Sequence, residues 1–284
     1  MTNYVSGAGG SHPHEPGVDL KWPASAIWRS GEPAVRQIRL TDIKDVIVEG
    51  IADFNAAPTH AIFLCLIYPI VGLVLFRVTF GYHLLPLVYP LLGGFALIGP
   101  AIAVGLYEIS RRRELGLDVS AWHVLEVYRS PHIGAIIRLS IVLLAIFVAW
   151  MMTARALYMQ SFGSNPPTSV SQFVNDILTT PAGHQVIFAG NLIGFFFAAL
   201  VLVISVVSFP MLVDRDVSVS TAVRTSVRAA FANPIPIAAW GLLVAVSLIL
   251  GALPLFFGLA VVFPVLGHAT WHLYRKLVSP NEVI

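Results

Sequence analysis

The sequence predicts an all-α polytopic membrane protein with six transmembrane helices. Of its 284 residues, 57% are apolar and only 11% are charged, whereas soluble domains carry roughly 25% charged residues. So few charges could not keep a chain of this length in water. Apolar runs long enough to cross a bilayer, which takes about 20 residues, recur along the chain. They cover residues 61–78, 84–109, 133–158, 186–213, 235–256 and 258–273.

The basic residues lie almost entirely on one side of these predicted spans. Fourteen of the 17 lysine and arginine residues precede the first span, follow the sixth, or fall in the loops after the second and fourth. The loops on the opposite side contain none. Because cytoplasmic loops of membrane proteins are enriched in Lys and Arg, we expect a multi-pass protein of a bacterial inner membrane with both termini in the cytoplasm.

The chain divides into a membrane domain and two tails. Residues 1–40 are glycine- and proline-rich without an apolar segment, so we expect a flexible cytoplasmic tail. Residues 41–276 are the predicted membrane domain, and residues 277–284 a short cytoplasmic C-terminal tail. Within the membrane domain, segments near 41–54, 120–129 and 218–231 have an apolar stripe at helical spacing but are too short and polar to span. They are predicted to be amphipathic helices in the membrane interface.

A proline follows each amphipathic segment and opens a spanning hairpin. Proline suits the first turn of a helix and disfavours helix in the preceding residue, so it marks a corner. The corner prolines are Pro58, Pro131 and Pro234. The second helix of each hairpin contains an internal proline, at Pro100, Pro210 and Pro264. The pattern predicts three degenerate repeats of interfacial helix plus spanning hairpin; a chance match is the alternative.

The first amphipathic segment has an acidic polar face, made by Asp42, Asp45, Glu49 and Asp53. Anionic lipid repels such a face, whereas it attracts basic residues. We therefore expect this helix to pack against the basic third segment, which carries Arg224 and Arg228, or against the basic cluster at residues 111–113.

Several motifs resemble a bacterial integral membrane family that is catalogued only as domain of unknown function 2189. They are GFALIGP at 94–100, GLYEISRR at 105–112, SFP at 208–210, DR at 214–215, NP at 233–234 and GHATWHLYR at 267–275. The resemblance covers roughly residues 39–276. It implies a multi-spanning membrane protein found largely in proteobacteria, and it implies neither an activity nor any catalytic residue.

His268 and His272, with Glu108, are the candidate metal ligands. Four residues apart on one helix, the two histidines share a face and could bind one ion. Glu108 matches His272 when the repeats are aligned, and two imidazoles with a carboxylate suit zinc, iron or copper. The alternatives are a buried hydrogen-bonding role and an interfacial position beside Trp271 and Arg275. We expect no other cofactor.

Two further segments predict a helix-packing face and a short helix on the protein surface. Gly190, Gly194 and Ala198 form a small-residue face on the fourth span, which predicts close helix packing within the fold or in an oligomer. Residues 169–178 predict one more short surface helix in the long loop on the side without basic residues.

The motifs leave three classes of function open. No glycine-rich phosphate loop, G-x-S-x-G, H-E-x-x-H or C-x-x-C motif is present, so no catalytic residue is assigned and neither nucleotide nor nucleic-acid binding is predicted. A non-enzymatic scaffold or accessory subunit, with the bilayer and other membrane subunits as partners, fits this lack best. A small transporter or channel fits the proline-broken helices and repeats. A metal- or haem-binding membrane enzyme would use His268 and His272.

Overall fold

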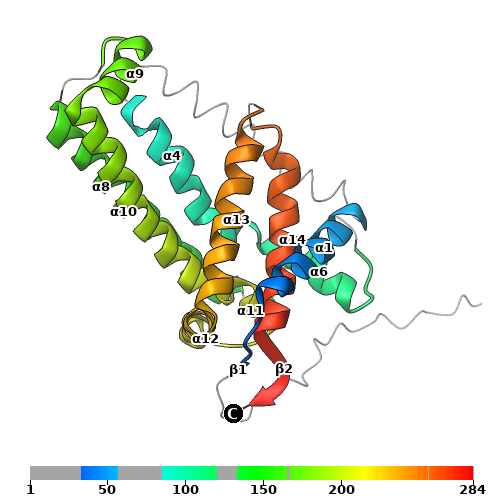
Figure 1. Cartoon of the computed structure of the whole chain (residues 1–284). Helices are drawn as coiled ribbons and strands as arrows, with labels where there is room; N and C mark the ends of the chain where they lie inside the picture. Colours follow the sequence, from blue (N-terminus) through cyan, green and yellow to red (C-terminus); the bar gives the residue numbers. More distant parts are fainter. Residues whose placement is uncertain (1–32, 57–84, 120–132, 165–166, 255, 284) are drawn as a thin grey trace, which may run out of the picture.

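The computed structural model describes residues 33–56, 85–119, 133–164, 167–254 and 256–283. In this part of the chain the protein is a bundle of long helices, with α9 at one end and α12 and a small sheet at the other (Figure 1). The predicted first span at 61–78, the second amphipathic helix at 120–129, Pro58 and Pro131 lie outside the described residues.

Four helical stretches of the described chain are long and apolar enough to cross a membrane, and they coincide with the second to fifth predicted spans. The first stretch comprises η1 (Leu85–Leu87), α4 (Val88–Phe95), η2 (Ala96–Ile98), α5 (Gly99–Ile102) and α6 (Val104–Glu114). The other three are α8 (Ile133–Phe162), α10 (Pro181–Ser205) continued by α11 (Ser208–Asp214), and α13 (Pro234–Ala252).

Helix α14 (Leu259–Leu277) occupies the sixth predicted span and runs back beside α13 (Figure 1). It is not among the four spanning helices. Its second half carries His268, His272, Arg275 and Lys276, which make it much more polar than its first half. Pro264 lies inside this helix, which continues past it.

Large apolar side chains cover the outer faces of the long helices. Ile141 on α8, Phe188 and Phe195 on α10, and Leu242 and Ile249 on α13 are each more than half exposed. A contiguous apolar exterior of this kind is unstable in water and suits a lipid environment. The exposed surface therefore supports the membrane location on grounds independent of composition.

Two of the predicted amphipathic segments form helices, and so does the predicted surface helix. They are α1 (Leu40–Ala56), α12 (Val219–Ala232) and α9 (Val170–Thr179). The side chain of Ser218 accepts a hydrogen bond from the Thr221 N–H, and Ser169 accepts one from the Gln172 N–H, both at 3.1 Å. These are N-caps, which satisfy amide groups that a helix leaves unpaired at its start.

A two-stranded antiparallel sheet joins segments that the sequence analysis assigned to the two tails. Strand β1 (Pro33–Val35) pairs with β2 (Val278–Val283), with Val35 opposite Val278. The Asn233 side chain accepts from the Ile38 N–H at 2.8 Å and donates to the Arg36 carbonyl at 3.0 Å. The strands are short and pair far along the chain, so no local periodicity could predict them.

The break between α10 and α11 is stabilised by a side chain from α12. Pro210 has no N–H and cannot bond the Val206 carbonyl, so the helix is interrupted there. The buried Ser226 hydroxyl donates to the Val203 carbonyl at 2.7 Å and accepts from the Val207 N–H at 3.2 Å. Pro100 stands at the start of α5, in a second interrupted stretch, and Pro234 opens α13.

The small-residue face on α10 lies partly against α8. A Cβ at Gly194 would lie 3.0 Å from the Trp150 ring, and one at Gly190 would lie 3.7 Å from Leu157. Ala198 is exposed. Gly190 and Gly194 therefore face side chains of α8 within the bundle, and the packing role of the three residues stays a prediction.

Helix α1 packs along α14 at a contact that only glycine permits. A Cβ at Gly50 would lie 2.7 Å from both the Cβ and the backbone nitrogen of Ala269. The same face of α1 also buries Ile43 and Val46. The two helix backbones therefore approach closely at Gly50, and this sets the position of the residues on either side.

Replacing Gly50 with Ala should lower the free energy of unfolding by about 1–3 kcal/mol, because the added methyl group meets backbone rather than a movable side chain. Thermal unfolding of the full chain in mild detergent measures the effect. Gly134→Ala on α8 is the matched control: a Cβ there meets nothing within 4 Å, so its stability should be unchanged or higher by up to about 1 kcal/mol. Equal stabilities of the two variants would contradict the close approach.

Candidate functional site: a polar cleft at the basic end of the bundle

A cleft of about 530 Å³ lies where α1, α6 and α14 meet. It is lined by polar and charged residues: Glu49, Asp53, Ser110, Arg113, Glu114, His272, Arg275 and Lys276. The three carboxylates are balanced by three basic side chains, with one histidine beside them. The cleft therefore has no strong net charge when that histidine is neutral. Two of its lining residues, Asp53 and Ser110, are buried.

Asp53 is the central residue of this site. It comes from α1 and is only 5% exposed. One carboxylate oxygen accepts from the Ser110 hydroxyl at 2.5 Å and contacts His272 Nε2 at 2.8 Å, while the other accepts from Arg113. Burial alone would raise the pKa of Asp53, but hydrogen bonds with His272 and Ser110 and the nearby histidines outweigh it, so the pKa is lowered. Asp53 is therefore ionised at neutral pH and joins α1 to α6 and α14.

Ser110 links Asp53 to a histidine deeper in the bundle. Its hydroxyl oxygen lies 2.8 Å from Nδ1 of His268, whose side chain is fully buried. Ser110 has one hydrogen, and the 2.5 Å contact with an ionised carboxylate requires it to point to Asp53. The serine oxygen must then accept from His268, which places a proton on Nδ1 of that ring; this assignment follows from the hydrogen-bond network.

His272 lies nearer the opening of the cleft. Its Nε2 contacts Asp53, and its Nδ1 lies 3.3 Å from a carboxylate oxygen of Glu49. Both of its ring nitrogens thus face carboxylates of α1. His268 and His272 do share one face of α14, as the spacing of four residues predicts, and both act as hydrogen-bonding groups facing α1 and α6.

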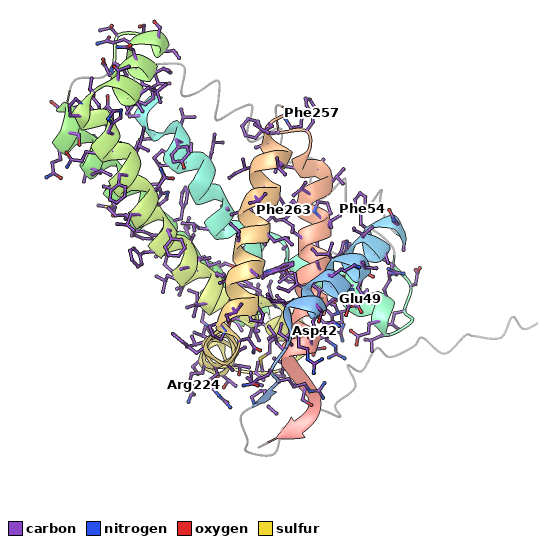
Figure 2. The ribbon with its side chains drawn as sticks, in the orientation of Figure 1. Asp42, Glu49, Phe54, Arg224, Phe257 and Phe263 are labelled. Atoms are coloured by element: carbon purple, nitrogen blue, oxygen red, sulfur yellow. The ribbon has the colours of Figure 1, made fainter. Side chains whose placement is uncertain are left out.

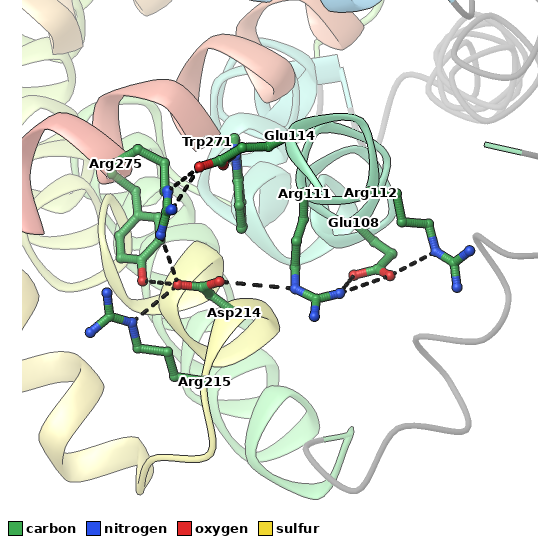
Figure 3. Close-up of polar contacts among 9 residues, drawn as sticks. Glu108, Arg111, Arg112, Glu114, Asp214, Arg215, Trp271 and Arg275 are labelled. Atoms are coloured by element: carbon green, nitrogen blue, oxygen red, sulfur yellow. Dashed lines mark hydrogen bonds and ion pairs between the residues drawn. The ribbon is translucent and has the colours of Figure 1, made fainter. Parts of the chain in front are cut away.

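The third candidate metal ligand lies in a different set of contacts. Glu108 is buried and pairs with Arg112 at 2.9 Å and with Arg111 at 3.3 Å (Figure 3). Within the described parts of the chain, no three His, Cys, Asp or Glu side chains are grouped so that they could hold a metal ion. The structure therefore brings the two histidines together with Asp53 and Glu49, and it places Glu108 with arginines.

A second polar cluster borders the cleft and is centred on Asp214, at the end of α11 (Figure 3). Its carboxylate accepts from the Tyr274 hydroxyl at 2.6 Å, from Arg215 at 3.1 Å and from Arg275 at 3.3 Å. Arg111 lies 3.9 Å away. Asp214 therefore connects α11 to α14 and to α6.

Glu114 completes the connection between α6 and α14. It accepts from Arg275 Nη2 at 2.6 Å and from the Trp271 indole N–H at 3.0 Å (Figure 3). Arg275 therefore bridges Glu114 and Asp214, which belong to different helices. Charged hydrogen bonds with this geometry fix side chains more firmly than isolated surface pairs do.

The acidic face of α1 finds its partners on α14 and α6. Lys276 lies 3.4 Å from Asp45 and 3.9 Å from Asp42. Figure 2 shows Arg224 projecting from α12 on the other side of this end of the bundle from Glu49. Of the two partners expected for α1, the cluster at 111–113 contacts it through Arg113, which pairs with Asp53.

Sequence reasoning identified both histidines but did not connect them with Asp53 or Ser110. A signal for Asp53 exists: the buried residues of α1 are Ile43, Val46, Gly50 and Asp53, so this carboxylate continues the apolar stripe at helical spacing. A carboxylate on a buried stripe needs a partner. Ser110 carries no comparable signal, because its role depends on which helices pack together.

The fold and its exposed apolar helices define a helical integral membrane protein. Residues 88–214 match the model of a family described as "Predicted integral membrane protein (DUF2189)". This match confirms the family resemblance found from the sequence motifs. It spans α4 to α11 and includes Ser110 and Asp214, whereas Asp53 and the two histidines lie outside it. No curated protein and no solved structure matches the chain.

Replacing Asp53 with Asn should lower the free energy of unfolding by about 1–3 kcal/mol at pH 7, because it removes a charged acceptor from buried donors. The folded pKa lies below the ordinary value of 3.8, so this contribution is complete above that value and is lost as the pH falls through the folded pKa. The difference in the free energy of unfolding between the wild type and the variant, measured from pH 7 to pH 3, should therefore narrow on acidification.

Asp45→Asn is the control for this comparison. Its side chain is 58% exposed and lies 3.4 Å from Lys276, so its loss should cost less than about 1 kcal/mol. An Asp53→Asn protein as stable as the wild type at pH 7 would show that the buried carboxylate does not hold the helices.

Proposed function

We propose that the chain crosses a bacterial inner membrane six times, with both termini in the cytoplasm. Helix α14 and residues 61–78 would supply the two spans beyond the four that the described chain provides. The proposal is supported by the placement of the basic residues. Helices α11 and α14 end where α12 and the sheet lie, away from α9 (Figure 1). Arg215 and Arg275 lie at these two helix ends, and Arg113 lies in the last turn of α6 and pairs with Asp53 of α1. This clustering is typical of a cytoplasmic face.

At that face, α1 and α12 would lie in the headgroup region, as amphipathic helices beside the spanning bundle. The strand pairing of β1 with β2 would hold the inner parts of both termini against the bundle. The proposed repeat unit, an interfacial helix followed by a spanning hairpin, is supported by α12, Pro234, α13 and α14, which follow one another in that order.

We propose that the protein acts as a non-enzymatic scaffold or accessory subunit of a membrane complex. The observation that carries this proposal is that acidic and basic side chains pair with one another where α1, α6, α11 and α14 meet. Asp53, Glu114 and Asp214 each bind basic groups from another helix. Such pairs fix the positions of α1, α6, α11 and α14, which gives a rigid cytoplasmic surface of defined shape.

A small proton-coupled transporter is the second candidate. It is favoured by the interruptions at Pro100 and Pro210, because transporters place broken helices around their binding sites. It is also favoured by the buried chain from Asp53 through Ser110 to His268, since ionisable groups inside a membrane bundle are costly and usually functional. A metal enzyme has less support, because Glu108 pairs with arginines and the histidines would need another third ligand.

Purification of the tagged full chain from its native membrane in mild detergent tests the accessory role. The expected result is co-purification with at least one other membrane protein in a ratio that stays fixed through repeated size-exclusion steps, and untagged membranes carried through the same steps are the control. A chain that purifies alone, and whose reconstituted vesicles accumulate a solute, would contradict the accessory role and favour the transporter.

A further inference from the structure

His268 has an unusual position for a buried polar side chain. It lies on α14, is fully buried, and contacts Ser110 through Nδ1 at 2.8 Å. The other ring nitrogen, Nε2, has no hydrogen-bond partner among the described residues. A buried polar atom without a partner costs free energy, so its presence in a native protein needs an explanation, of which a functional role is one. Because the Nδ1 position carries the ring proton, Nε2 is a free acceptor.

The contacts around Ser110 form a continuous path between this ring and the cleft. From the inside outward, the order is His268 Nδ1, the Ser110 hydroxyl at 2.8 Å, Asp53 at a further 2.5 Å, and His272 Nε2 at a further 2.8 Å. His272 and Asp53 line the cleft. Each step is within hydrogen-bond distance, which is the separation that proton transfer requires.

We propose that His268 is a proton-binding site inside the bundle, connected to the cytoplasmic cleft through Ser110 and Asp53. A proton bound at Nε2 makes the ring cationic. The ring then releases its Nδ1 proton to the Ser110 oxygen while the Ser110 hydroxyl proton passes to Asp53, which becomes neutral. Asp53 then releases that proton to water in the cleft. The ring is then neutral with its proton on Nε2, and its Nδ1 accepts from the Ser110 hydroxyl. The same steps in reverse carry a proton in from the cleft, restore the Nδ1 proton and release the proton from Nε2.

Charged groups from all three surrounding helices set the balance of this path. The titratable and charged groups that face it are Glu49 and Asp53 from α1, Arg113 and Glu114 from α6, and His272, Arg275 and Lys276 from α14. Burial of the ring is the largest influence and disfavours a second proton on His268, as do His272 and Arg113. The ionised Asp53, which lies 4.0 Å from Nδ1, and the Leu106 carbonyl favour it. The inference goes beyond an accessory role and does not depend on it, because a proton site could serve a scaffold or a transporter.

Nitrogen NMR of the full chain in lipid nanodiscs, with ¹⁵N-labelled histidine, tests the proposal directly. The resonances of His268 are assigned by their loss in the His268→Gln variant. In the wild type at pH 7, the proton should reside on Nδ1. In Ser110→Ala, exchange of that proton with water should slow by about tenfold or more, because the path to the cleft is interrupted.

Ser140→Ala is the matched control, since it removes a hydroxyl that bonds the Ile136 carbonyl within α8, away from this path. It should leave the His268 exchange rate unchanged. A proton on Nε2 in the wild type would overturn the proposal without any variant. Equal exchange rates in the wild type and Ser110→Ala would overturn it as well.

Discussion

The buried carboxylate of Asp53 is the interaction on which this end of the molecule depends. It is ionised and nearly inaccessible, yet it belongs to an amphipathic helix rather than to the main bundle. Taking such a charge out of water is costly, and that cost is offset only when charged or polar donors surround it. Ser110, Arg113 and His272 meet this need from two other helices. Helix α1 therefore cannot leave the bundle without separating these groups.

The same principle governs the backbone where the helices are interrupted. In a bilayer, each amide or carbonyl group that a proline releases needs another partner. At the α10–α11 break, Ser226 from α12 bonds the Val203 carbonyl and the Val207 N–H, which do not pair with each other there. Asn233 binds the N-terminal segment at the corner between α12 and α13. Helix α12 and the break between α10 and α11 are thus mutually dependent: the break leaves backbone groups unsatisfied, and the neighbouring helix satisfies them.

The spanning helices could be predicted from the sequence because lipid imposes its constraint on each segment separately. The apolar runs at 133–158 and 235–256 correspond closely to α8 and α13. The capping serines and the corner residue Pro234 likewise determine the backbone of the helix turn in which they lie, so they too could be predicted from local sequence. His268 and His272 could be identified because histidines in an apolar helix are conspicuous. Their partners could not, since Asp53 is more than 200 residues away and the α1–α14 contact depends on Gly50 meeting Ala269.

Hydrogen–deuterium exchange of α1 in the full chain in nanodiscs most directly tests the claim that Asp53 fixes this helix to the bundle. The account predicts that the amides of α1 exchange in the wild type as slowly as those near the C-terminal end of α14, and that they alone become fast in Asp53→Asn. Rapid exchange of α1 in the wild type, or slow exchange that persists in the variant, would contradict it.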